Sequence, residues 1–333
     1  MKTSINRFSS VYLAETASVV GNKESEGPLK DSFDSIEKDA YFGTDTFEKA
    51  ESEMVRRALN LLLGKAGKAP EDISILLGGD LLNQCVATSF AAAKTQIPYL
   101  GMYGACSTII ESSIVASAFI NGGLADNAAV MASSHFCTAE RQYRFPLEYG
   151  SQKTPTAQNT VTGCGAYLLQ REPTQYRVKE AVIGKIVDNG IKDVNNMGAA
   201  MATAAVDTIL RFFNESESKP EDYDLIATGD LGKEGHEITL ELFSRCGLNL
   251  GDKYTDCGML IYDLEKQDMH SGASGCACLA TVFGGHIFKQ MKNNVLKNVL
   301  LIGTGALLNR NSAMQNETIP SIAHLLHICK ENQ

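Results

Sequence analysis

The chain has 333 residues, of which 44% are hydrophobic and 21% charged, a balance that excludes a disordered chain and predicts about two domains. Its 30 basic and 39 acidic residues give a formal net charge of −9, which excludes a nucleic-acid binder with a broadly basic surface. No run reaches the roughly 18 consecutive apolar residues of a membrane-spanning helix.

The N-terminal segment and the cysteines predict the compartment. The first twenty residues lack the basic and then apolar pattern of a secretion signal. Nine irregularly spaced cysteines are typical of reduced thiols, so we expect a cytoplasmic protein. The close pair Cys276 and Cys278 has no zinc-type spacing and is expected to be buried rather than metal-binding.

Two segments 150 positions apart share one pattern. Residues 70–81 and 220–231 each place a Pro-Glu-Asp turn before a short apolar run that ends in Gly-Asp-Leu. Such runs predict buried parallel strands. An amphipathic helix is predicted before each of them, over residues 47–63 and about 197–213.

A second pair of segments matches at an offset of 170. Gly104-Ala105-Cys106 is predicted to open a helix that runs to residue 121 and leads into a strand over 128–132. Ser274-Gly275-Cys276 opens a helix to about residue 291, followed by a strand over 299–302. One α/β unit is therefore duplicated, and we expect mostly parallel sheets with helices on their faces. We place the halves at 1–173, with an inserted loop at about 133–160, and 174–333.

Cys106 is the first candidate for chemistry. At a helix start, free amides and the helix dipole favour negative charge, so the pKa of this thiol is expected to be lowered. The alternative is a small packed residue without chemistry. Gly275 and Cys276 repeat the arrangement in the second copy, and His270 either faces Cys106 or is a hydrogen-bonded loop residue.

The polar stretch 133–150 supplies further candidates. His135 directly follows a predicted strand and is expected at the carboxyl edge of the sheet, where ligands of α/β proteins bind. Arg141 and Arg144 are three positions apart and suit a bidentate clamp on a carboxylate. The alternative is a solvated loop in which both arginines pair with Glu140 and Glu148.

These features resemble the thiolase and ketoacyl-synthase superfamily. The resemblance rests on the duplicated half, the Gly-x-Cys helix start and His-Ser-Gly-Ala-Ser-Gly at 270–275. It implies a five-layered αβαβα fold of two tandem halves, usually as a homodimer. A narrower match, to the stage V sporulation protein AD family, rests on the motifs GDLLNQ (79–84), GACST (104–108), TAERQ (138–142), EYGSQK (148–153), SGCAC (274–278) and ETIPSIAH (317–324).

The narrower resemblance implies a binding protein without established turnover. Relatives of this kind bind dipicolinic acid, with calcium, for its uptake into the developing spore, and membrane proteins of the same sporulation operon are the expected partners. The expected location is the spore or forespore, peripheral at the inner membrane. No cofactor or resident metal is expected, apart from calcium carried with the ligand. The expected ligand-binding residues are Cys106, Ser107, His135, Arg141, Arg144, His270 and Gly275.

Departures from the catalytic relatives support that interpretation. Condensing enzymes place a base opposite the cysteine, whereas the corresponding strand here ends in Thr-Gly-Asp-Leu at 228–231. Leu301 lies where thiolases carry a second cysteine, and His270 lies one residue closer to Gly272 than in the thiolase pattern. We therefore expect no enzyme. The alternatives are an acyl-CoA transferase or condensing enzyme that uses Cys106 as nucleophile, and a structural adaptor of a membrane complex.

Dipicolinate is a planar dianion that chelates calcium, and its site needs cationic donors and flat apolar walls. Tyr103 or Phe136 would supply a wall beside one of the two arginines. Asp80 or Asp230 would supply oxygen to calcium, or else each caps the loop that follows it.

Overall fold

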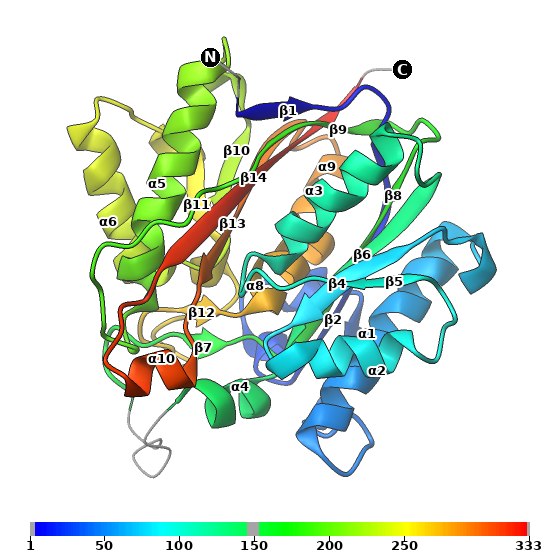
Figure 1. The fold of residues 1–333 in the computed structure, drawn as a ribbon, viewed down its shortest axis with the longest axis horizontal. Coiled ribbons are helices and arrows are strands. Elements are labelled where there is room, and N and C mark those ends of the chain that lie inside the picture. Colours follow the sequence, from blue (N-terminus) through cyan, green and yellow to red (C-terminus); the bar gives the residue numbers. More distant parts are fainter. Residues whose placement is uncertain (1–3, 145–152, 332–333) are drawn as a thin grey trace.

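The computed structural model describes residues 4–144 and 153–331 and has two halves that share one strand order (Figure 1). The strands of the first half are β2 (Tyr12–Val20), β4 (Leu76–Asp80), β5 (Tyr99–Gly101), β6 (Asn127–Ser134) and β8 (Gly163–Gln170). Those of the second half are β9 (Tyr176–Val182), β10 (Leu225–Thr228), β11 (Tyr254–Asp256), β13 (Asn298–Ala306) and β14 (Ser321–Lys330).

The strand order β5-β4-β6-β8-β2 of the first half is repeated as β11-β10-β13-β14-β9 in the second. In each half the first three strands are parallel neighbours, and the fourth, β8 or β14, runs against both of its neighbours. Four of five strands therefore share one direction, as predicted. A Pro-Glu-Asp 3-10 turn precedes β4 and β10, as the repeat indicates.

The halves meet where β2 pairs with β9, at Tyr12 and Arg177. Two short strands extend the sheets of the halves: β1 (Ile5–Arg7) pairs with β9, and β3 (Ser35–Ile36) pairs with β2. Strands β7 (Asn159–Thr160) and β12 (Ala273–Ser274) form a separate two-stranded parallel sheet. Because β1 comes from the start of the chain, the second half contains a strand from the first. A boundary at residue 173 stays a prediction.

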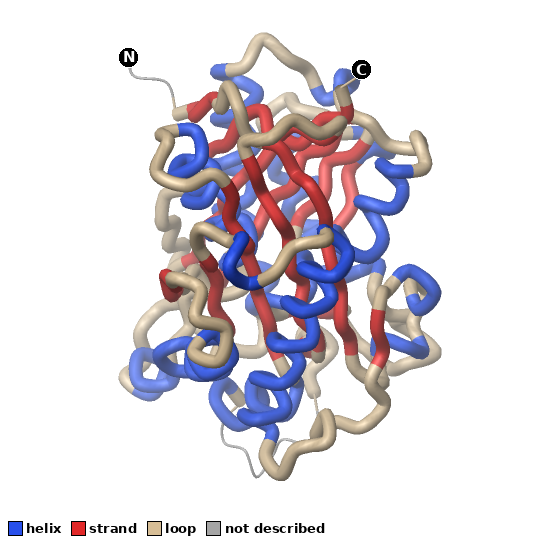
Figure 2. The backbone as a smooth tube through the Cα atoms, turned by 90° about the vertical axis from the view of Figure 1, so that its right-hand side faces the viewer, coloured by secondary structure: helices blue, strands red, loops and turns tan. Residues whose placement is uncertain are grey.

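Helices form three layers, one on the outer face of each half and one between the halves (Figures 1 and 2). The first half carries α1 (Phe47–Ala66), α2 (Val86–Ala92), α3 (Thr108–Asn121) and α4 (Phe136–Tyr143). The second carries α5 (Met197–Glu215), α6 (Gly232–Arg245), α7 (Cys257–Leu260), α8 (Cys276–Val282), α9 (Phe288–Lys292) and α10 (Arg310–Met314). Helix α1 packs on the outer face of the first half and α5 on that of the second, while α3 contacts strands of both. The five layers αβαβα are confirmed.

Glycines on β13 bring α3 close to the second half. A Cβ atom at Gly303 would lie 2.8 Å from Cγ1 of Ile110 on α3. At Gly305 it would lie 2.5 Å from the carbonyl oxygen of Gly104, in the turn before α3. The position of that turn therefore depends on the absence of side chains on this face of β13.

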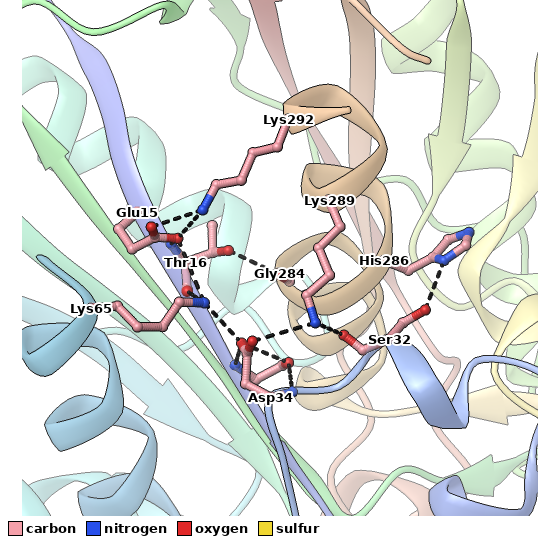
Figure 3. Close-up of polar contacts among 10 residues, drawn as sticks. Glu15, Thr16, Ser32, Asp34, Lys65, Gly284, His286, Lys289 and Lys292 are labelled. Atoms are coloured by element: carbon pink, nitrogen blue, oxygen red, sulfur yellow. Dashed lines mark hydrogen bonds and ion pairs between the residues drawn. The ribbon is translucent and has the colours of Figure 1, made fainter. Parts of the chain in front are cut away.

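An ion-pair cluster ties α1, β2 and α9 together (Figure 3). Asp34 accepts a hydrogen bond from Lys65 of α1 at 3.2 Å and pairs with Lys289 of α9 at 3.4 Å. Glu15 of β2 pairs with Lys292 at 2.7 Å. These three contacts join an outer helix to the central layer around one edge of the first sheet.

A π-helical segment, Phe283–Ile287, separates α8 from α9. The hydroxyl of Thr16 donates to the carbonyl of Gly284 at 2.8 Å, and Ser32 Oγ lies 3.1 Å from Nδ1 of His286 (Figure 3). Side chains of the first half thus satisfy polar groups of the irregular helix. Within residues 4–144 and 153–331, none of the helices is both long enough and apolar enough to cross a membrane.

Candidate functional site

Cys106 lies in the turn between β5 and α3, one residue before the N-cap Ser107. Ala105 adopts a left-handed φ of +51°. The backbone N–H groups of Ser107 and Thr108 donate to the carbonyls of Gly104 (3.1 Å) and Ala105 (3.2 Å). The buried Ser107 hydroxyl donates to Gly104 as well, at 2.6 Å. These amides are therefore already hydrogen-bonded and are not available to a thiolate.

The Cys106 thiol faces the carboxyl group of Asp230, which follows β10. Burial, the negative charge of Asp230 and the hydrogen bond to that carboxylate raise the pKa of the Cys106 thiol well above its ordinary value. The N–H of Gly275 acts in the opposite direction and does not compensate. The expected lowering of this pKa is therefore wrong, because the sulfur is buried, the N–H groups of Ser107 and Thr108 are already hydrogen-bonded, and a carboxylate lies beside the thiol.

Asp230 is held in place by the second half. Thr304 Oγ1 donates to its Oδ1 at 2.7 Å, and Gly275 N–H donates to its Oδ2 at 3.1 Å. Burial raises the pKa of Asp230 to about 6. Gly275 has a φ of +105°, and a Cβ there would lie 2.7 Å from Ser134 Oγ, so only glycine fits the position.

The two carboxylates expected to serve calcium are both engaged by the protein. Asp80 accepts hydrogen bonds from Leu82 N (3.0 Å), Thr88 N (2.8 Å) and Thr88 Oγ1 (2.7 Å). Asp230 accepts those described above. For Asp80 the contacts match the alternative of a loop cap, while Asp230 faces the cysteine.

A cavity of about 50 Å³ lies over the cysteine. It is lined by Leu81, Tyr103, Ala105, Cys106, Tyr143, Thr160, Met197, Ser274, Ala306 and Leu308. The Tyr143 hydroxyl donates to the Leu81 carbonyl at 2.6 Å. Tyr103, whose hydroxyl lies 3.1 Å from that of Tyr143, must therefore be the donor of their shared hydrogen bond. Tyr103 and Tyr143 give the cavity an aromatic wall, and most of the other lining residues are apolar.

A second cavity, of about 70 Å³, is lined by the charged side chains of Glu140, Arg144 and Lys153. It shares Tyr143, Thr160, Met197 and Leu308 with the first cavity. Arg144 pairs with Glu140 at 2.8 Å, and Lys153 pairs with the same carboxylate at 3.2 Å. The ammonium group of Lys153 also lies 4.7 Å from the ring centre of Phe136. Two cationic side chains are thus placed next to the apolar cavity over Cys106.

The other predicted residues lie elsewhere. His135 is buried and caps α4: its Nδ1 accepts from Cys137 N at 3.1 Å, and its Nε2 lies 2.8 Å from the carbonyl of Ala40. These partners require the neutral tautomer with hydrogen on Nε2, and burial lowers the pKa of His135 accordingly. Its contacts give it a structural role in holding α4.

Arg141 pairs with Glu48 and lines a separate hollow with Asn83, Gln142 and Arg310. His270 has a φ of +51° and lies 3.9 Å from the exposed Asp268. The predicted pairing of Arg144 with Glu140 is present, whereas Glu148 lies outside the described residues. Cys276 and Cys278 are buried thiols that donate to the carbonyls of Ala105 (3.0 Å) and Gly229 (3.3 Å).

The structure thus brings Cys106 and Arg144 into adjoining cavities and adds residues that sequence reasoning missed. Lys153 lies in the EYGSQK motif that carried the resemblance, so a signal for it was present. Met197 and Leu308 come from the second half, where periodicity marks them only as apolar. The binding roles of the predicted residues stay predictions.

Comparison with known proteins agrees with this geometry. A family profile described as stage V sporulation protein AD matches residues 2–329. The stage V sporulation protein AD of Bacillus subtilis (strain 168) is 43% identical over 314 residues, which cover 94% of this chain and 93% of that protein.

Solved structures show the fold. OleA of Xanthomonas campestris superposes with a TM-score of 0.63 at 15% identity and covers 97% of this chain and 99% of its own. The 3-oxoacyl-(acyl-carrier-protein) synthase III of Aquifex aeolicus superposes with a TM-score of 0.58 at 12% identity, over 96% of this chain and 99% of its own. The chain therefore has a thiolase-like fold and belongs to the stage V sporulation protein AD family.

Proposed function

We propose that this sporulation protein binds dipicolinic acid, accompanied by calcium, for its uptake into the developing spore, and that it catalyses no reaction. The observation that carries the proposal is the pair of adjoining cavities, apolar over Cys106 and cationic at Arg144 and Lys153. The family supports a role in sporulation.

The chemistry of the ligand suits this arrangement. A flat aromatic ring packs between Tyr103 and the apolar wall, while its two carboxylates turn towards the guanidinium and ammonium groups. Both cavities are far smaller than the roughly 300 Å³ at which typical ligand pockets begin. Binding therefore requires side chains around Tyr143 to move, and a small planar dianion needs less movement than a long acyl chain.

The proposal extends to partners and location. We infer that the chain acts as a homodimer at the inner membrane of the spore or forespore, through membrane proteins of its operon. The absence of turnover is supported by the Cys106 thiol, whose pKa is raised by burial and by its carboxylate neighbour rather than lowered by a base.

Calorimetry tests the binding. The wild-type protein is titrated with dipicolinate with and without calcium chloride, and with the isomer pyridine-3,5-dicarboxylate. We expect heat from dipicolinate only, and at least a tenfold weaker affinity for Arg144→Gln and for Lys153→Met, because each loses a charged donor to a carboxylate.

Arg141→Gln is the matched control, because Arg141 lies in the last turn of α4, close in sequence to Arg144, but pairs with Glu48 and lines the separate hollow. Its affinity is expected to stay within a factor of two. Absence of heat from dipicolinate under both conditions contradicts the proposal. Incubation with acetyl-CoA and malonyl-CoA tests turnover: an acyl adduct in the intact mass that Cys106→Ala removes would favour the transferase instead.

A further inference from the structure

A third space adjoins the two cavities of the candidate site, which are called the inner cavities from here on. It is the hollow that Arg141 lines, it has a volume of about 390 Å³, and we call it the outer hollow. Ligand pockets generally measure about 300–1,000 Å³, so the outer hollow is large enough for a ligand as it stands, whereas the inner cavities are not. Tyr143 lines all three spaces and therefore lies where they meet.

Three hydrogen bonds join the last turn of α4 to the loop that follows β4. Gln142 Nε2 donates to the carbonyl of Leu81 at 2.8 Å, and the Tyr143 hydroxyl donates to the same oxygen at 2.6 Å. The backbone N–H of Asn83 donates to Gln142 Oε1 at 3.3 Å. We call these three bonds the seam.

The seam separates residues that line different spaces. In the loop, Leu81 lines the inner cavity over the cysteine, whereas the next residue, Leu82, lines the outer hollow. At the end of α4, Gln142 lines the outer hollow and Arg144 lines the charged inner cavity. Each bond of the seam involves the side chain of Gln142 or Tyr143. Rotation of these two side chains therefore opens the wall between the spaces without a change in the backbone.

The outer hollow carries a positive charge without a partner. Within residues 4–144 and 153–331, the guanidinium of Arg310 makes no hydrogen bond or ion pair, and it lines the hollow. The other cation there, Arg141, pairs with Glu48. A cation that is not neutralised at the edge of a hollow attracts anions and raises their rate of entry.

We propose that the outer hollow is the entrance for the dianionic ligand, and that Gln142 and Tyr143 are the gate between this entrance and the inner cavities. The inference rests on the proposed function and adds the route of the ligand and the residues that control it. The anion first meets Arg310, the two gate side chains rotate aside, and the seam closes again once the carboxylates lie beside Arg144 and Lys153.

Stopped-flow tyrosine fluorescence tests the gate, because the chain has 11 tyrosines and no tryptophan. The full chain is mixed with dipicolinate and calcium chloride. Gln142→Ala removes two of the three bonds, and we expect its association and dissociation rates to rise together by about fivefold or more, because a hydrogen bond changes an equilibrium constant by roughly two- to tenfold. Tyr143→Phe removes the third bond and should change both rates in the same direction. Because the seam is closed before and after entry, the ratio of the two rates should change little.

Matched variants control for lost hydrogen bonds and for lost charge. Gln267 also makes two hydrogen bonds to the backbone, to Lys23 O at 2.8 Å and from Asp263 N at 2.9 Å, and it lines none of the three spaces. Gln267→Ala should therefore keep the wild-type rates. Arg310→Gln should lower the association rate about threefold in low salt and less in high salt, whereas Arg245→Gln on α6 changes the net charge equally and should have no such effect.

Wild-type rates in both Gln142→Ala and Tyr143→Phe overturn the entrance while leaving the binding proposal intact. Weaker binding by Gln142→Ala without faster association overturns it as well, because that result assigns the side chain to the bound ligand instead of the gate. A poorly folded variant lowers the amplitude of the signal and does not raise its rate, so it cannot imitate the expected result. If the wild type binds no dipicolinate, the proposed function fails and the entrance fails with it, so the wild-type titration distinguishes the two failures.

Discussion

Substitution of Gly305 by alanine tests how the cysteine turn is positioned. The added Cβ would lie 2.5 Å from the carbonyl oxygen of Gly104 and 3.3 Å from Ser107 Oγ. The nearer atom belongs to the backbone and cannot rotate away, so the turn and the start of α3 must shift by most of an ångström. Forcing a methyl group into a packed core costs about 1–3 kcal/mol, and we expect Gly305→Ala to lose that much stability.

Gly64→Ala is the control, because it is the same substitution but is expected to raise the stability instead of lowering it. Gly64 lies in α1, and a Cβ there meets no atom within 4 Å. Alanine in a helix is favoured over glycine by about 0.5–1 kcal/mol, so this variant should gain stability.

Thermal and urea unfolding measure both variants. In a chain of this length each kcal/mol moves the melting temperature by about 1–2 °C. Gly305→Ala should melt lower than the wild type and Gly64→Ala slightly higher. If Gly305→Ala is as stable as the wild type, β13 does not set the position of the turn and the reasoning is wrong.

Two further substitutions probe buried charge. Burial beside Asp80 raises the pKa of Glu51 to about 8, above the ordinary 4.5, so the folded state loses stability as pH rises from about 4.5 to 8. Urea midpoints at pH 5 and pH 8 should show this loss in the wild type but a smaller one in Glu51→Gln, and equal losses would contradict the assignment. Asp34→Ala leaves the backbone N–H of Ser18 without its acceptor and removes a carboxylate partner from Lys65 and Lys289, so it should cost about 1–3 kcal/mol in urea unfolding. The exposed carboxylate of Asp45 is the control, since Asp45→Ala should change little, and similar losses for both would show that the cluster in Figure 3 adds no stability.

The repeated elements could be predicted from the amino-acid sequence. The helix predicted over 47–63 is α1, Phe47–Ala66, and the strand predicted over 299–302 lies within the longer β13. Turn residues and hydrophobic spacing are local properties, so two copies of the same pattern predict two copies of the same unit. The reversed direction of β8 and β14 could not be predicted from the sequence, because the alternation of apolar residues does not fix which strand pairs with which.

Tertiary structure alone decided the chemistry of the site. Cys106 and Asp230 are 124 positions apart in the sequence and meet only when the two halves pack together. His135 follows a strand end, as predicted, but burial and two backbone partners make it a helix cap. A side chain's residue type and spacing show what it is able to do, whereas its pKa and partners depend on groups that packing brings within a few ångströms. For this protein, the sequence specified a duplicated α/β scaffold with a cysteine at its centre, and the packing of the halves placed a carboxylate beside that cysteine.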